Sequence, residues 1–586
     1  MPDSTGLPSQ YAGMTPRILS NAEQDLYAQC MREFGLFTQY RNAGFAGQWE
    51  EVASLILPTS RNTFFYGSYN TPGQKQTQLQ VDATGMMALN RFKAICDSLM
   101  TPRNMMWHTL AADNEYVMKD KKSREWFQTV TNILFAERYK PHANFSSQNQ
   151  ANWQSLGAFG NGSMFVDAFD GPGGGLRYRG CPLGETFWGE NHQGIIDRMY
   201  RWFRLTGWQA EQKWKGRLPA QMQQALASSS PQLYDFIHVV KPRDDGSYDP
   251  EAPDERRMAF MSYYVSITGT CLMWNEGSEG MVQGYRAFPF APMRYDQAPN
   301  ENYGRGPAMM VLPALKTLNA QKKTFLKQGH RAADPVLLSA DDGIMNFSMR
   351  PGAMNKGGMS PDGKPLVGVL PTGDIATNEK MMEMEQGLIN SAFLVDLFQI
   401  LTETPQMTAT EVIERTHEKG ILIAPTLGRQ EGEYLGPTID RELDVLAYQG
   451  KIPPMPPRLA EAQGEYKVVY QSPLAKAQHA QEVAGTLRVV ENVREVVAIT
   501  GDPSPLDRFN FDNFAEDAAI INGTRERWLR TDDEIAALRQ NRARAQQQQQ
   551  QLEALPGKAA ILNAQAKVAK QGATFPEQGR NAGSLQ

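Results

Sequence analysis

The sequence predicts an α+β protein in which long helices outnumber short strands. Apolar residues recur at three- and four-residue spacing from Ser20 to Leu57, and Pro58 ends that helix. The segment SMFVDAF, from Ser163 to Phe169, follows three spaced glycines and alternates as a strand does. Further helices are expected at 86–100, 126–139 and 145–156, and further strands at 105–110, 236–240 and 263–267.

The region between these strands is also predicted to be helical. An aromatic helix is expected from Ile195 to Lys215 and a second helix from Leu218 to Leu226. The aromatic side chains of the first helix are interpreted as ordinary core. Residues 281–290 are expected to complete a mixed sheet with the two strands that precede them.

Length and composition indicate a protein of several domains without a global charge bias. The chain has 586 residues, of which 41% are hydrophobic and 21% charged, and its formal net charge is -5. Any surface that faces nucleic acid must therefore be local. Four widely separated cysteines indicate synthesis in a reducing cytosol. Without an export signal or an apolar run of membrane-spanning length, the chain is expected to be neither exported nor inserted in a membrane.

Two predicted helices with an irregular insert between them organise the rest of the chain. The first runs from Gly306 to Ala332 with apolar residues on one stripe, and no acidic residue occurs between Glu301 and Asp334. About six basic residues lie in this region of an acidic protein. They are Arg305, Lys316, Lys322, Lys323, Lys327 and Arg331. A Gly-, Pro- and Met-rich insert follows at 333–373, and the second helix is expected at 374–401.

The C-terminal part is predicted to be helical and to end in a low-complexity tail. The Pro-rich stretch 451–459 is interpreted as a stiff connector, and helices are expected at 474–499, 513–522 and 532–540. Six consecutive glutamines stand at 546–551. From residue 536 onward seven Lys or Arg stand against two Glu, a local balance of +5. This basic tail is interpreted as solvated, with contact to packaged DNA as the alternative.

No catalytic motif is complete in the sequence. The segment from Gly358 to Pro365 matches a phosphate loop only up to Lys364, because Pro365 replaces the Ser or Thr that holds Mg²⁺. The seven histidines show no metal-ligand spacing, and there is no GxSxG nucleophile elbow. Glu411 and Glu414 are interpreted as a salt-bridged helix surface rather than an acid-base pair. The expectation is a protein that is not an enzyme and holds no cofactor or metal.

Several strings, in order along the chain, resemble the portal proteins of short-tailed phages, which are podoviruses. They are DATG at 82–85, GAFGNGSMFVD at 157–167, YGRGP at 303–307, TATEVIER at 408–415, the segment 429–440 and SPLAKAQ at 472–478. Pro102 and the pair Trp107-His108 fit the same pattern. The resemblance covers most of residues 20 to 545 and is more specific than one motif. It implies the α+β portal fold, with wing, stem, clip and helical crown.

The resemblance implies a dodecameric ring at one capsid vertex of the virion, a head-to-tail connector through which double-stranded DNA is packaged and ejected. The partners implied are capsid and scaffolding proteins, the terminase motor and a tail adaptor protein. The expected division is a wing at 1–305, a first stem helix at 306–332, a clip at 333–373 and a second stem helix at 374–402. A channel loop and wing helix at 403–459, a helical crown at 460–560 and a flexible basic tail at 561–586 follow.

The site residues expected from this reading lie on the first stem helix and on one loop. Lys316, Lys322, Lys323, Lys327 and Arg331 are expected to face DNA in the channel, since sequence-independent DNA contact depends mostly on charge. Glu403, Thr404, Gln406 and Met407 are the preferred candidates for a constricting channel loop, and residues 350–364 are the alternative. A different virion structural protein, of shell or tail, and a degenerate packaging ATPase or nuclease are the competing functions.

Overall fold

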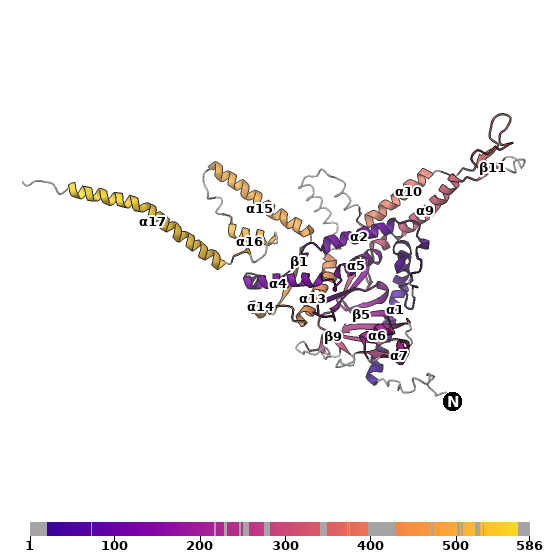
Figure 1. Cartoon of the computed structure of the whole chain (residues 1–586), viewed down its shortest axis with the longest axis horizontal. Coiled ribbons are helices and arrows are strands. Elements are labelled where there is room, and N and C mark those ends of the chain that lie inside the picture. Colours follow the sequence, from indigo (N-terminus) through magenta and orange to yellow (C-terminus); the bar gives the residue numbers. More distant parts are fainter. Residues whose placement is uncertain are drawn as a thin grey trace, which may run out of the picture.

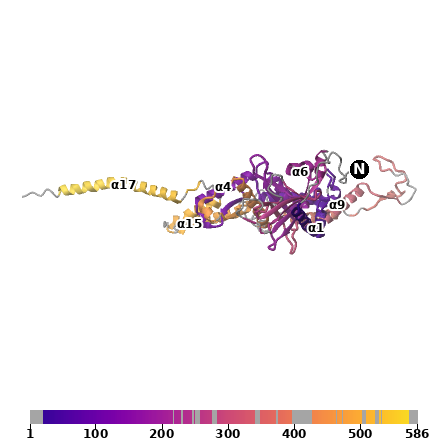
Figure 2. The same cartoon turned by 90° about the horizontal axis from the view of Figure 1, so that it is seen from below.

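The computed structural model describes most of the chain from residue 20 to residue 571 (Figure 1). The longer segments outside the described residues are 1–19, 250–256, 275–281, 340–347, 396–425, 522–527 and 572–586, and the shorter ones are 69, 72, 216–217, 228–230, 245, 247, 372, 374, 427, 463, 472, 501–503, 505–507 and 531. An α+β body lies at the centre. One pair of helices projects from the body, and the C-terminal helices extend from it on the other side (Figures 1 and 2). The predicted α+β class is confirmed.

The described strands form four sheets, and every strand pair in them is antiparallel. The largest has the order β4-β5-β6-β7-β8, with β9 also paired to β7. Its strands are β4 (Thr186–Glu190), β5 (Ile196–Thr206), β6 (Leu233–Pro242), β7 (Phe260–Ser266), β8 (Cys271–Met273) and β9 (Gln283–Tyr285). The others pair β10 (Phe290–Arg294), β2 (Asn161–Ala168) and β3 (Leu176–Gly180); β1 (His108–Ala112) and β13 (Tyr466–Tyr470); and β11 (Leu337–Ser339) and β12 (Val367–Val369).

The helices of the body cover these sheets, and two further groups leave it. The body contains α1 (Asn21–Ile56), α2 (Thr84–Met100), α3 (Glu115–Met118), α4 (Lys121–Arg138), α5 (Phe145–Phe159), α6 (Gly207–Lys213), α7 (Ala220–Ala227), α13 (Gly436–Tyr448) and α14 (Pro457–Glu461). The projecting pair consists of α9 (Leu312–Ala333), preceded by the short α8 (Pro307–Met310), and α10 (Ile375–Ala392). The C-terminal helices are α15 (Pro473–Thr500), α16 (Phe511–Ile521) and α17 (Asp532–Gln571).

The predicted aromatic helix at 195–215 is wrong, because most of it is the strand β5 followed by α6. Strand β5 lies between β4 and β6, and its residues from Met199 to Phe203 are all buried. A strand covered on both faces loses its alternation of polar and apolar residues, so periodicity cannot distinguish it from a buried helix. The helix begins only at Gly207, where the Thr206 side chain accepts a hydrogen bond from the Gln209 backbone.

The predicted mixed sheet also needs correction. Strands β6 and β7 are neighbours as expected, but they are antiparallel, like every other pair in that sheet. The segment expected to complete the sheet divides between two sheets, since β9 pairs with β7 whereas β10, which starts at Phe290, pairs with β2. Residue 281 lies outside the described residues.

A buried ion pair joins α4 to α13 in the body. The Arg138 guanidinium donates to both carboxylate oxygens of Glu442 at 2.9 and 2.5 Å, and neither side chain is exposed to solvent. The Tyr178 hydroxyl on β3 donates to the same carboxylate at 2.6 Å, and the ring of His108 on β1 lies 2.9 Å from the guanidinium. Burial alone lowers the pKa of Arg138, but the Glu442 carboxylate raises it above its ordinary value.

The Pro-rich connector is part of the body rather than a free boundary. The Trp126 indole donates to the Pro453 carbonyl at 3.0 Å, and Leu459 is fully buried. Strand β13 then pairs with β1 along its whole length, from Tyr466 to Tyr470. The C-terminal helices therefore separate from the body only after Tyr470.

The helix predicted at 532–540 continues much further than expected. Helix α17 extends through the glutamine run to Gln571, and its described side chains from Arg539 to Gln549 are all exposed. Alanine, glutamine, arginine and lysine are good helix formers, which explains a long helix in a segment with little apolar area for a core.

Replacing Arg138 by Met is expected to destabilise the body strongly. The substitution leaves the Glu442 carboxylate buried without its cation, which costs about 3–5 kcal/mol in proteins. The exposed pair Arg539–Asp512 supplies a matched control, because an ion pair that lies in solvent contributes little to stability. Chemical denaturation of R138M and R539M measures both. Equal stability of the two variants would contradict the structural role of the buried pair.

Candidate functional site

The projecting helix pair begins at a close contact between two glycines. A Cβ added to Gly306 would lie 2.5 Å from the backbone nitrogen of Gly160 and 2.7 Å from the Leu156 carbonyl oxygen. Gly160 itself has a φ of +71°, which L side chains rarely adopt. The Asn161 amide donates to the Gly304 carbonyl and accepts from the Gly304 nitrogen. Two of the strings that carry the resemblance, GAFGNG and YGRGP, therefore pack against each other.

The short helix α8 starts directly from this contact. Helix α9 follows it and is anchored along its first turns. Gly306 is the N-cap of α8, and Pro307 occupies the first helical position. Leu315 and Leu318 are buried, as the apolar stripe predicts. The side-chain amide oxygen of Asn319 accepts hydrogen bonds from the backbone nitrogens of Val81 and Asp82, at 2.8 and 3.2 Å. The remaining length of α9 projects from the body beside α10 (Figure 1).

The five basic residues predicted on α9 lie in three different environments. Lys316 is paired with Glu51 of α1 at 2.6 Å, so its charge is balanced within the subunit. Lys322 is half-buried and lies 5.6 Å from the centre of the Phe325 ring. Lys323, Lys327 and Arg331 are exposed, and no described acidic residue pairs with them. The last three residues thus present unbalanced positive charge.

Of the two candidate channel loops, the structure describes only the alternative one. Glu403, Thr404, Gln406 and Met407 lie outside the described residues, so their assignment stays a prediction. The alternative, residues 350–364, lies between β11 and β12 at the far end of the helix pair from the body (Figure 1). That position is remote from the junction at which a constriction was expected.

The segment that partly matches a phosphate loop forms a tight turn in which its amides are already used. The Ser360 nitrogen donates to the Lys364 carbonyl at 2.8 Å, and the Gly363 nitrogen donates to the Ser360 carbonyl at 2.9 Å. Strand β12, not a helix, follows the turn. The geometry of a phosphate loop, with free amides at a helix start, is therefore not formed in this segment.

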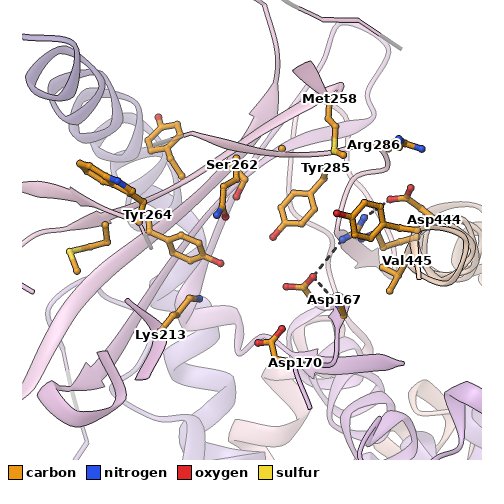
Figure 3. Close-up of a pocket in the computed structure, with 18 of the residues that line it drawn as sticks. Asp167, Asp170, Lys213, Met258, Ser262, Tyr264, Tyr285, Arg286, Asp444 and Val445 are labelled. Carbon is orange, nitrogen blue, oxygen red and sulfur yellow. Dashed lines mark hydrogen bonds and ion pairs between the residues drawn. The ribbon is translucent and has the colours of Figure 1, made fainter. Parts of the chain in front are cut away.

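A cavity of about 490 Å³ lies in the body between the large sheet and α13. Its charged lining is balanced, with three acids and three bases: Asp167, Asp170, Asp444, Lys213, Arg286 and Arg441. Figure 3 shows Lys213, Asp167 and Asp170 pointing into it beside Tyr264 and Tyr285. Arg441 lies 3.5 Å from Asp167 and also pairs with Asp444, so this part of the lining joins α13 to β2.

Burial sets the protonation behaviour of the cavity. Burial, reinforced by the Arg201 charge, lowers the pKa of Lys213 to about 8, and the ammonium lies 3.9 Å from the centre of the Tyr264 ring. Burial raises the pKa of Asp167, although Arg441 opposes that shift. Neither sign of charge dominates, so the cavity has no simple preference for an anion or a cation.

Metal and membrane features are absent from the part of the chain that the structure describes. No cluster of three or more His, Cys, Asp or Glu side chains suitable for a metal ion occurs there. No described helix is long and apolar enough to cross a lipid bilayer.

Sequence reasoning missed two features of the projecting pair. The first is the glycine contact, whose only signal was the presence of glycines in two separate motifs. The second is the surface of α10, where Met381, Met384 and Leu388 are exposed on one stripe. Their helical spacing is the signal in the sequence that could have identified this stripe.

Comparison with known proteins gives consistent matches over most of the chain. A family model described as "Bacteriophage head to tail connecting protein" matches residues 35–529. The probable portal protein of Bordetella phage BPP-1 is 27% identical over 532 residues, which are 88% of this chain and 90% of that protein. The portal protein of Salmonella phage epsilon15 is 24% identical over 519 residues, covering 86% and 89% respectively.

Two solved structures with detectable similarity are neck assemblies. The neck of a native GTA particle computed with C12 symmetry matches with a TM-score of 0.33 and 12% identity, covering 68% of this chain and 86% of that one. The neck of an empty GTA particle computed with C6 symmetry matches with a TM-score of 0.33 and 11% identity, covering 68% and 84%.

Replacing Gly306 by Ala is expected to destabilise the base of the projecting pair. The added methyl group meets backbone atoms below 3 Å, and overpacking of this kind costs about 1–3 kcal/mol. Gly329, inside α9, is the matched control, because an added Cβ there meets no atom within 4 Å. Ala at this position is expected to stabilise the helix by up to about 1 kcal/mol. Thermal unfolding compares the two variants. A loss of stability in G329A equal to that in G306A would refute the glycine contact.

Proposed function

This chain belongs to the bacteriophage head to tail connecting protein family, and on that premise we propose that it is the portal of a phage particle. Copies of the chain form a closed ring at one vertex of the capsid. Double-stranded DNA enters and leaves the head through the axis of this ring. The observation that carries the proposal is the family match over residues 35–529, together with portal proteins at 27% and 24% identity over most of their length.

The elements of the subunit correspond to the wing, stem, clip and crown of a portal. The body of sheets and helices up to Tyr470 is the wing, α9 and α10 are the two stem helices, and the segment between them with β11 and β12 is the clip. Helices α15, α16 and α17 form the crown and its tail. The buried residues of the body and the exposed length of the stem pair support this division.

Helix α9 is the part of the subunit that we assign to the DNA channel. Lys323, Lys327 and Arg331 are exposed and unbalanced by described acids, and the half-buried Lys322 adds to the charge of the same helix, whereas Lys316 is paired with Glu51. Cyclic symmetry repeats these cations around the axis, where a phosphate polyanion passes. Arginine and lysine contacts to phosphates carry no sequence information, which suits a channel for any genome sequence.

The partners follow from the position of a portal in the particle. We propose that the ring meets capsid and scaffolding proteins during head assembly, then the terminase motor at the clip, and afterwards a tail adaptor protein. The protein is made in the host cytoplasm and resides in the virion. Its role is structural and translocational rather than catalytic, without a cofactor.

Negative-stain microscopy of the purified full-length chain tests the portal proposal directly. Rings with a central hole are the expected particles, and twelve copies are the expected number. Sheets or icosahedral fragments would indicate a shell protein instead. Compact particles without a hole would indicate the packaging ATPase or nuclease.

Replacing Lys323, Lys327 and Arg331 together by Gln is expected to weaken DNA retention in assembled rings. The loss should be largest at low salt, where each phosphate contact contributes most. K316Q is the matched control, because that charge is already paired with Glu51. Filter binding of duplex DNA to purified rings of equal size, across a salt series, measures both. Equal retention by triple-variant and wild-type rings at every salt concentration would exclude α9 from the channel wall.

A further inference from the structure

Helix α10 exposes an apolar stripe that nothing in the described subunit covers. The exposed fractions of Met381, Met384 and Leu388 are 48%, 73% and 59%, and the three residues recur at helical spacing. The opposite side of α10 is buried against α9 and α2 through Met382 and Ile389, and the buried Phe393 directly follows the helix. Contiguous exposed apolar side chains mark an interaction surface, and methionine adapts well to a partner.

The same helix carries two exposed acids one turn apart, Glu379 and Glu383. Neither has an ion-pair partner among the described residues. Helix α9 carries the unpaired bases Lys323 and Lys327, with the same spacing of four residues. The stem pair therefore exposes two acids, Glu379 and Glu383, and four bases, Lys323, Lys327, Arg331 and Lys380, that have no ion-pair partner among the described residues.

The contact between the two helices fixes how these charges are placed. The side-chain amide of Asn378 on α10 donates to the side-chain amide oxygen of Gln328 on α9 at 2.6 Å, so these two residues lie at the same level. The helices are antiparallel and rise equally per residue. One residue further toward the C-terminus of α10 and one residue back toward the N-terminus of α9, Glu379 is level with Lys327. Five residues from the contact in the same two directions, Glu383 is level with Lys323.

The acids and the bases lie on opposite faces of the helix pair. At roughly 100° per residue, Lys327 and Lys323 are turned about 100° and 140° away from the contact line, toward one face. Glu379 and Glu383 are turned by the same angles on α10. Because the helices are antiparallel, the same rotation directs the two glutamates toward the face of the helix pair opposite the lysines. The same count places the apolar stripe of α10 on the basic face.

We propose that the two faces of the stem pair are complementary and that a second copy of this chain docks basic face to acidic face. Lys327 and Lys323 of one copy then lie level with Glu379 and Glu383 of the next. Met381 and Met384 lie on the same basic face of α10 and are covered by the neighbouring copy in this contact. A contact between different faces is head-to-tail and repeats until it closes. The inference rests on the proposed ring and names the residues that join its stem.

The lysines in this arrangement lie between the neighbour's acids and the channel. Each ammonium on its flexible stem reaches either side, so the acids hold the bases in place without removing them from the lumen. Substitutions of the acids therefore weaken the subunit contact while every base that can contact DNA stays in place.

Charge reversal tests the pairing. K327E and E379K are each expected to raise, by roughly tenfold or more, the protein concentration at which half of the chains are in rings, since like charges then meet at the contact. The double variant K327E/E379K is expected to return this concentration close to the wild-type value, because both partners are exchanged. Mass photometry over a dilution series measures ring and monomer fractions. Failure of the double variant to recover would overturn the pairing.

Mixing the two single variants gives a second and independent readout. In an equal mixture, K327E has acids on both faces and E379K has bases on both, so the two alternate around a ring of even subunit number. The mixture is expected to form rings at concentrations where neither variant does alone. No gain on mixing would overturn the head-to-tail arrangement.

The apolar part of the contact has its own matched pair. M384E is expected to abolish rings at concentrations where M384L forms them, because leucine keeps the apolar surface. Equal ring formation by both would overturn the role of the stripe. Thermal unfolding of each variant confirms that the exposed substitutions leave the subunit folded. If the wild-type chain itself forms no ring, the portal proposal fails, whereas wild-type rings with no response to these variants refute only this interface.

Discussion

The close contact between Gly160 and Gly306 is the constraint on which the geometry of the projecting pair depends. It brings the end of α5 within backbone distance of the start of α8, so that α9 leaves the body at one defined point. Leu315 and Asn319 then fix the direction of the first turns. For the channel wall proposed above, rigid attachment matters because charges that face a passing polymer must keep their position relative to the axis.

The sequence predicted those elements whose apolar residues fall on one face. Helices α1, α2 and α9 have such stripes and were placed nearly to their observed ends. Strand β5 was taken for a helix because both of its faces are covered, so burial left no period to detect. The pairing of β13 with β1 was equally beyond sequence reasoning, since it joins residues more than 350 positions apart.

The candidate site was predicted in composition but not in arrangement. The absence of acids along α9 identified its five bases, yet only the structure shows that Glu51, from a distant helix, balances Lys316. The acids of α10 appeared unremarkable in the sequence, because their relation to Lys323 and Lys327 depends on the level at which the two helices pair. Tertiary register of this kind is fixed by contacts such as Asn378 with Gln328, which have no local sequence signal.

A channel for DNA must attract a polyanion without holding it. Fully unbalanced lysines repeated around a ring would bind phosphates tightly, and the salt dependence of such binding would be steep. If the acids Glu379 and Glu383 of a neighbouring copy share those lysines, the net field in the lumen falls while every ammonium stays available for transient contact. Assembly of the ring would then tune the electrostatics of the path, so that the same side chains join the subunits and let the genome slide.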